Sequence, residues 1–109
     1  GDEWLEQLLQ YLKGNVDYVC NFLQERIPSI HCVPPQGTYL MWLDFREWGM
    51  THEEIYQFLI DKAGWGVNEG SMFGEEGRGW MRVNIATQRS VLEQAMEQLY
   101  QAWLQLPKK

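Results

Sequence analysis

The chain begins with a long amphipathic pattern, and this pattern restricts the folds that the remaining residues can form. Between Asp2 and Ile27, apolar residues recur at intervals of three and four, and Pro28 ends the pattern. The apolar positions are Leu5, Leu8, Leu9, Leu12, Val16, Val19, Cys20, Leu23 and Ile27. This spacing predicts one long helix with a single packed face. Gly14 and Asn15 lie in its middle, where glycine costs about 1 kcal/mol relative to alanine, so a kink or a break there stays open.

Two strands and a second helix are predicted next. Residues 29–33 and 38–45 are rich in β-branched, aromatic and aliphatic side chains, and a Pro-Pro-Gln-Gly turn separates them. Thr51 and Glu54 then have the spacing of a capping box, which marks a helix start. The helix is expected to end at Gly64. Its expected buried residues are Ile55, Phe58, Leu59 and Ala63.

Six of the ten glycines lie between residues 64 and 79, around a short strand candidate at residues 65–68. Residues 68–79 are expected to form a shaped loop in which the backbone comes close to another group. A strand containing Arg82 follows, and Thr87 is the expected cap of a third helix. The predicted buried residues of that helix are Leu92, Ala95, Met96, Leu99, Trp103 and Leu106.

The order of these elements predicts an α+β fold. A helix, two strands, a helix, two strands and a helix suit a small, mainly antiparallel sheet of three to four strands with helices packed on one face. A length of 109 residues corresponds to one domain.

Composition excludes several classes of function. A net charge of −6 and a pI near 4.8 argue against nucleic acid as a partner. No apolar run approaches the roughly 20 residues that span a bilayer, so we expect no membrane partner and a cytoplasmic location. Cys20 and Cys32 are expected to be buried, reduced thiols. His31 and His52 have no partner at metal-ligand spacing, so no metal site is predicted.

Arg82 is the strongest candidate for chemistry. With a period of two, Met81 and Val83 face the core, whereas Arg82 and Asn84 face away from it. A guanidinium on a rigid strand suits bidentate binding of a carboxylate. The alternative is a surface salt bridge, which contributes only about 0–1 kcal/mol.

Three ordered motifs resemble a known family. They are the run of residues 37–46 (Gly-Thr-Tyr-Leu-Met-Trp-Leu-Asp-Phe-Arg), the spaced pattern Gly70-x-x-Phe73-Gly74-x-x-Gly77-x-Gly79, and Arg82-Val83-Asn84-Ile85-Ala86 before a helix. Together they resemble the C-terminal small domain of fold-type I pyridoxal-phosphate enzymes of the class I/II aminotransferase superfamily. The resemblance is strongest to the cystathionine β-lyase-like subgroup of C–S lyases. It implies that residues 1–109 are a single domain of a longer enzyme.

The resemblance assigns roles to individual residues. Arg82 matches the arginine that binds the α-carboxylate of the amino-acid substrate, and Asn84 and Tyr39 are further candidates for substrate binding. Gly70, Phe73 and Gly74 would line the entrance to the active site, again by resemblance. Whether the parent enzyme is an aminotransferase or a C–S β-lyase stays open.

The resemblance also implies a cofactor and partners that this chain does not carry itself. The parent would use pyridoxal 5'-phosphate, bound through a Schiff-base lysine in a Ser/Thr-x-x-Lys setting of the large domain. Lys13 and Lys62 do not match that setting, so the isolated chain is expected to bind no cofactor and to be inactive. The implied partners are an amino-acid substrate, the large domain of the same chain and a second subunit of a homodimer.

A second hypothesis is a self-standing α+β module that binds another protein. Six Trp, five Tyr and four Phe are many aromatic residues for a chain of this length. Some of them are expected to lie at an interface or a pocket, because aromatic side chains with polar edges are common there.

Overall fold

The computed structural model describes residues 2–33, 40–65, 73–77 and 79–107. Within these ranges the chain forms the following elements in order: α1 (Asp2–Arg26), β1 (His31–Val33), β2 (Leu40–Asp44), the 3-10 helix η1 (Arg46–Trp48), α2 (His52–Asp61), β3 (Phe73–Gly77), β4 (Trp80–Asn84) and α3 (Arg89–Leu104). The strands form one sheet in the order β1-β2-β4-β3, and every neighbouring pair is antiparallel. The predicted α+β fold is confirmed.

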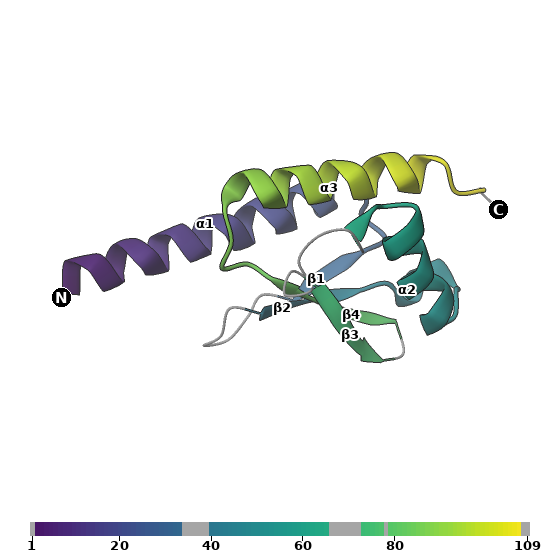
Figure 1. Ribbon diagram of the computed structural model, residues 1–109, viewed down its shortest axis with the longest axis horizontal. Coiled ribbons are helices and arrows are strands. Elements are labelled where there is room, and N and C mark those ends of the chain that lie inside the picture. The colour runs from purple at the N-terminus through teal and green to yellow at the C-terminus, as the bar shows by residue number, and fades with distance from the viewer. Residues whose placement is uncertain (1, 34–39, 66–72, 78, 108–109) are drawn as a thin grey trace.

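The helices form a layer on one side of the sheet. Figure 1 shows α3 alongside the second half of α1, with α2 at the opposite end of the molecule from the N-terminus. The first half of α1 extends beyond the sheet and α3, which accounts for the elongated outline of 51 × 24 × 23 Å. No α-helix in the described part of the chain covers the outer face of the sheet (Figure 1).

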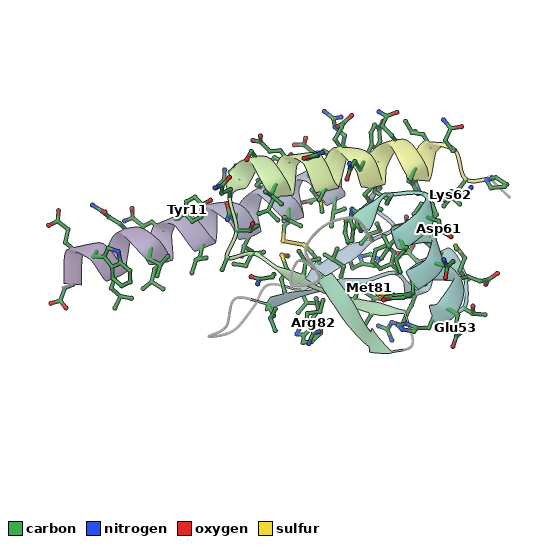
Figure 2. The ribbon with its side chains drawn as sticks, viewed as in Figure 1. Tyr11, Glu53, Asp61, Lys62, Met81 and Arg82 are labelled. Atoms are coloured by element: carbon green, nitrogen blue, oxygen red, sulfur yellow. A yellow bond between two sulfur atoms is a disulfide. The ribbon has the colours of Figure 1, made fainter. Side chains whose placement is uncertain are left out.

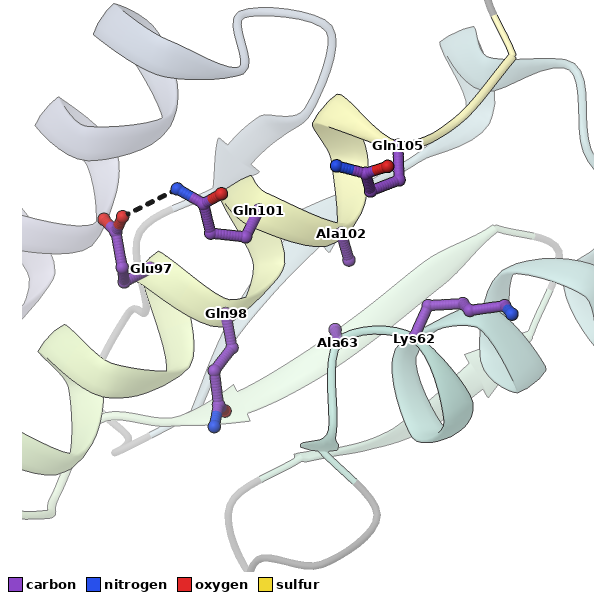
Figure 3. A pocket seen from close by; sticks show the side chains of 7 residues that line it. All are labelled: Lys62, Ala63, Glu97, Gln98, Gln101, Ala102 and Gln105. Atoms are coloured by element: carbon purple, nitrogen blue, oxygen red, sulfur yellow. Dashed lines mark hydrogen bonds between the residues drawn. The ribbon is translucent and has the colours of Figure 1, made fainter.

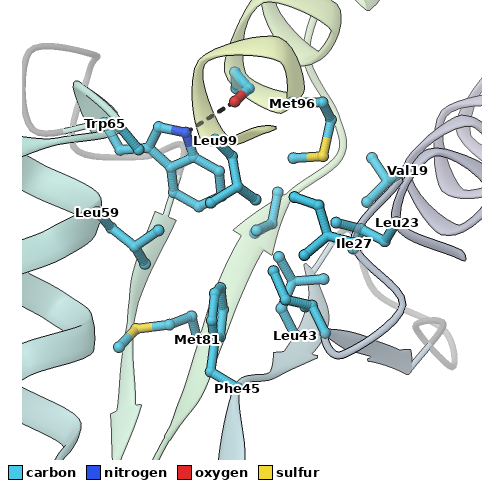
Figure 4. Close-up of a cluster of buried hydrophobic side chains, with 14 of the residues drawn as sticks. Val19, Leu23, Ile27, Leu43, Phe45, Leu59, Trp65, Met81, Met96 and Leu99 are labelled. Atoms are coloured by element: carbon cyan, nitrogen blue, oxygen red, sulfur yellow. Dashed lines mark hydrogen bonds between the residues drawn. The ribbon is translucent and has the colours of Figure 1, made fainter. Parts of the chain in front are cut away.

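One hydrophobic core joins the helices to the inner face of the sheet (Figure 4). The indole nitrogen of the buried Trp65 donates a hydrogen bond of 3.1 Å to the carbonyl of Ala95, which ties the segment after α2 to α3. The inward-facing residues of β2 and β4, all buried, are Met41, Leu43, Met81 and Val83. Their alternation with less buried residues is the period-two pattern expected from the sequence.

Helix α1 is continuous, so the break considered at Gly14 and Asn15 does not occur. The second half of the predicted apolar face is buried more fully than the first, in which Leu8 packs partly against the core. Leu12, Val19, Leu23 and Ile27 are buried, whereas Leu5 and Leu9 are 48% and 57% exposed. The apolar pattern therefore continues beyond the core of this domain.

The start of α2 is as predicted, but the start of α3 is not. Thr51 and Glu54 form the complete capping box, and Gly64 has the positive φ of 73° that favours glycine after a helix. The N-cap of α3 is Gln88 and not Thr87. The carbonyl of Thr87 accepts hydrogen bonds from α1, which holds this residue in the turn before the helix.

The third strand differs from the prediction. Trp65 lies in a 3-10 turn, and residues 66–68 of the expected strand lie outside the described residues. Strand β3 (Phe73–Gly77) instead falls within the segment expected to be a loop. Its Phe-Gly-Glu-Glu-Gly sequence has low strand propensity, but backbone pairing with β4 outweighs it.

The prediction of reduced cysteines is also wrong. Cys20 of α1 and Cys32 of β1 form a disulfide. The chain turns tightly after α1, with the Ile30 amide donating to the Ile27 carbonyl, and β1 then runs back along the helix. This brings the two Cα atoms to 5.8 Å, within the range that a disulfide requires.

None of the helices in the described part of the chain combines the length and the apolar content needed to cross a bilayer.

Two leucines of α1 provide a matched test of this packing. Leu23→Ala should lower the free energy of unfolding by about 2–5 kcal/mol, because it leaves a cavity in the core. Leu5→Ala should change it by no more than about 0.5 kcal/mol, because Leu5 is half exposed. Urea denaturation of both variants checks this, and equal losses would contradict the described position of α1.

Candidate active site

The outer face of the sheet carries Arg82. On β4 the burial alternates, so Met81 and Val83 lie in the core while Trp80, Arg82 and Asn84 are only partly buried. Figure 2 shows Arg82 on the side of the sheet away from α1 and α3. The prediction that Arg82 faces away from the core is therefore confirmed.

The two neighbouring strands give Arg82 different surroundings. Trp42 of β2 is directly opposite Arg82 in the register, so the two side chains share one face and lie close together. On the other side, Gly74 of β3 pairs with Arg82. Because glycine has no side chain, β3 places no side chain directly opposite Arg82 at this register position.

No carboxylate among the described side chains forms an ion pair with Arg82. Asp44, at the end of β2, is bonded to Arg46 instead. Its Oδ1 accepts from the Arg46 backbone amide at 2.9 Å and from Nε at 3.0 Å, and its Oδ2 accepts from Nη2 at 2.9 Å. The alternative of a surface salt bridge at Arg82 therefore has no partner among these residues.

Hydrogen bonds from Arg46 lower the pKa of the Asp44 carboxyl, although burial of this group acts in the opposite direction. Asp44 is only 8% exposed, and the Arg46 guanidinium lies 4.8 Å from the centre of the Trp80 ring. The Asp44–Arg46 ion pair, with the Trp80 ring beside it, thus occupies one end of the outer face.

Gly79 holds the start of β4 in place. Its carbonyl accepts from the Phe45 amide at 2.8 Å, and its amide donates to Nδ1 of His52 at 3.1 Å. Gly79 has a φ of 91°, and an added Cβ would lie 3.0 Å from Cγ of Arg46. His52 is therefore structural, as expected, and so is His31, which pairs with Glu47 at the surface.

The remaining candidate residues fall into three groups. Asn84 shares the outer face, and its Oδ1 accepts from the Ala86 amide at 2.8 Å, so its NH2 group is the part suited to a carboxylate. Phe73 and Gly74, expected in the entrance loop, lie in β3. Tyr39 and Gly70 lie outside the described residues. Their predicted roles stay predictions.

The sequence reasoning missed the importance of Asn15. This residue is fully buried in α1, and its side chain bonds to the backbone just after β4. The sequence feature that could have indicated this role is a polar residue next to a glycine in the middle of an apolar helix pattern.

A separate cavity of about 420 Å³ lies between the end of α2 and α3. Its lining residues are Lys62, Ala63, Glu97, Gln98, Gln101, Ala102 and Gln105. Figure 3 shows the Lys62 amine directed away from Gln98, and Glu97 accepts a hydrogen bond from Gln101. Its polar groups do not converge on one point. Within the described residues, no group of three side chains suits a metal ion.

Comparison with known proteins identifies the family. Residues 1–99 match the sequence profile of aminotransferase class I and II. The chain is 35% identical to Protein MalY of Escherichia coli over 102 residues, which covers 94% of this chain and 26% of that protein. It is 28% identical to cystathionine beta-lyase PatB of Bacillus subtilis, covering 91% of this chain and 26% of that protein.

Solved structures agree with the sequence comparison. Cystalysin from Treponema denticola, which contains a pyridoxal 5'-phosphate cofactor, superposes with a TM-score of 0.81 at 34% identity and covers 96% of this chain. A putative aminotransferase from Clostridium difficile, bound to the same cofactor, gives 0.79 at 38% identity and covers 94%. The chain corresponds to 27% and 26% of those two proteins.

The α+β fold is consistent with the small domain of aminotransferases, and the two solved structures that it resembles contain pyridoxal phosphate. The chain belongs to the class I and II aminotransferase family. It spans about a quarter of the length of the relatives it matches.

Enzymes of this family use pyridoxal phosphate, but the described residues do not form a site for it. Lys13 lies on α1 and Lys62 lies beside α2, so neither shares the outer face of the sheet with Arg82 (Figure 2). The groups around Arg82 suit a carboxylate and not the covalent attachment of an aldehyde.

The ion pair at the edge of this face gives a prediction about pH. Because the folded-state pKa of Asp44 is lowered, its stabilisation is present above the unfolded pKa of about 3.9 and is lost as the pH falls through the folded value. Asp44→Asn should lower the free energy of unfolding by about 1 kcal/mol at neutral pH. The difference between variant and parent should shrink in acid.

Denaturation curves at several pH values measure this difference. Asp17→Asn, an exposed carboxylate on α1, is the matched control and should change stability little. A loss in Asp44→Asn that stayed constant as the pH was lowered through the whole acid range would contradict this role for the ion pair.

Proposed function

We propose that this chain is the small domain of a longer pyridoxal-phosphate-dependent enzyme and that Arg82 binds the α-carboxylate of its amino-acid substrate. The observation that carries the proposal is the position of Arg82. It lies on the open face of the sheet, beside Trp42 and opposite a glycine, without an ion-pair partner among the described residues.

The proposed role of Arg82 is positioning. A guanidinium donates two parallel hydrogen bonds to a carboxylate, which fixes both the place and the orientation of the substrate. The rigid strand that carries Arg82 fixes its backbone, so less entropy is lost when the substrate binds than for an arginine on a flexible loop. Pyridoxal phosphate, when bound to the parent enzyme, supplies the electron-sink chemistry for breaking bonds at the substrate Cα.

The reaction is proposed at the level of its substrate class. The relatives include enzymes named cystathionine beta-lyase and a putative aminotransferase, with similar identity to this chain. Both activities require an amino acid with a free α-carboxylate. We therefore propose an aminotransferase or C–S β-lyase activity for the parent enzyme, in the cytoplasm.

The proposed partner of the small domain is the large domain of the same polypeptide. The first half of α1 exposes Trp4, Leu5, Leu9 and Tyr11, which are 67%, 48%, 57% and 42% accessible. An apolar surface of this kind is typical of an interface. The family relationship favours this partner over the alternative of a self-standing interaction module. A homodimeric parent is part of the same proposal.

Arg82→Ala in the full-length enzyme tests the role of the arginine. We expect kcat/KM for an amino-acid substrate to fall by the equivalent of about 2–5 kcal/mol, since a substrate carboxylate would lose its charged partner. Arg26→Ala is the control, because it removes an equal charge from the exposed end of α1. Unchanged kinetics in Arg82→Ala would refute the proposal.

The 109-residue chain alone should not bind amino acids measurably. The carboxylate is only one of the groups through which the enzyme would bind its substrate. Arg82 alone therefore supplies only a small part of the binding free energy. Calorimetric titration with cysteine or cystathionine should give no heat beyond dilution. Saturable heat in the 109-residue chain that was absent from its Arg82→Ala variant would show that the chain binds amino acids without the rest of the enzyme.

A further inference from the structure

The middle of α1 contains a polar contact that the proposed function does not use. Asn15 is fully buried near the middle of α1, and Leu12 and Val19 pack on either side of it along the helix. A buried polar side chain is costly unless its hydrogen-bonding groups are satisfied. Asn15 meets this condition through the segment that connects β4 to α3.

The Asn15 amide makes three hydrogen bonds across the domain. Its Nδ2 donates to the carbonyl of Ile85 at 2.8 Å and to the carbonyl of Thr87 at 3.1 Å. Its Oδ1 accepts from Nε of Arg89 at 2.5 Å. Asparagine supplies two donors and an acceptor in one small group, which neither aspartate nor leucine can do.

Neighbouring residues reinforce this contact. The Tyr11 hydroxyl donates to the Thr87 carbonyl at 2.7 Å, and the Arg89 guanidinium lies 6.0 Å and 5.8 Å from the ring centres of Tyr11 and Tyr18. A Cβ on Gly14 would lie 2.7 Å from Nη2 of Arg89. Glycine at this position therefore allows the arginine to approach the helix.

The contact acts on the strand that carries Arg82. Ile85 directly follows the last residue of β4, and Arg82 lies on that strand. The Asn15 bonds hold the backbone at Ile85 and Thr87, so the end of β4 cannot shift relative to α1 without breaking them. The first half of α1 extends away from this point as part of one continuous helix (Figure 1).

We propose that Asn15 is a positioning residue that fixes the direction in which β4 presents Arg82 relative to α1; this rests on the proposed role of Arg82 in binding a carboxylate. Under the proposed function, Arg82 and the cofactor of the parent enzyme act on the same substrate from different parts of the polypeptide. A displacement of Arg82 of about 1 Å would therefore weaken carboxylate binding substantially.

The decisive variant is Asn15→Asp in the full-length enzyme. Aspartate keeps the size of the side chain and the acceptor for Arg89, but it cannot donate to the two carbonyls when ionised. We compare the affinity for an amino acid with that for the amine that lacks its α-carboxylate. The amino-acid affinity should fall about 10- to 100-fold, while the amine affinity should stay within about twofold, the size of a small surface effect.

Matched variants separate the possible outcomes. Asn21→Asp makes the same change at an exposed position of α1 and should leave both affinities unchanged. Equal losses for the amino acid and the amine in Asn15→Asp would indicate a merely structural role and overturn the inference. A retained preference for the carboxylate in Asn15→Asp would also overturn it.

Arg82→Ala distinguishes this inference from the proposed function. If Arg82→Ala does not reduce the preference for the amino acid over the amine, the proposed function fails and the inference fails with it. If Arg82→Ala removes the preference and Asn15→Asp does not, only the inference fails.

If the Asn15→Asp variant does not fold, Arg89→Lys is the deciding variant, because lysine keeps the charge but lacks the Nε donor. Arg89→Lys should reduce the preference for the amino acid over the amine. An unchanged preference would overturn the inference.

Discussion

Antiparallel pairing between β2 and β4 determines which way the important side chains of the sheet face. The register sets Met41 opposite Val83 and Leu43 opposite Met81 on the inner face, where all four are buried. The same register sets Trp42 opposite Arg82 on the outer face. A shift by one residue would bury the guanidinium and expose the core residues, so the stability of the core also fixes the position of Arg82.

Charges on the outer face are arranged so that one cation stays without a partner among the described residues. Asp44 is the buried carboxylate of this face, and three hydrogen bonds from Arg46 satisfy it. Arg46 thus stabilises the fold through its ion pair with Asp44, whereas Arg82 faces the surroundings of the domain.

Local patterns predicted much of this arrangement, and long-range contacts account for the rest. The alternation around Arg82 and the capping box at Thr51 depend on neighbouring residues, so the sequence alone predicted them correctly. Strand β3 depends on pairing with β4, and the Cys20–Cys32 disulfide depends on how β1 runs back along α1. The shift of the α3 cap from Thr87 to Gln88 likewise follows from hydrogen bonds with a distant helix.

The apparent defect in α1 has a physical explanation in the same long-range contacts. Gly14 and Asn15 weaken an isolated helix, one through backbone entropy and the other through competing side-chain hydrogen bonds. In the folded domain the glycine admits Arg89 and the asparagine satisfies the carbonyls of Ile85 and Thr87. A helix pattern that is locally unfavourable at one point thus marks where the helix is joined to the strand that carries Arg82, because only a tertiary contact compensates for the local cost.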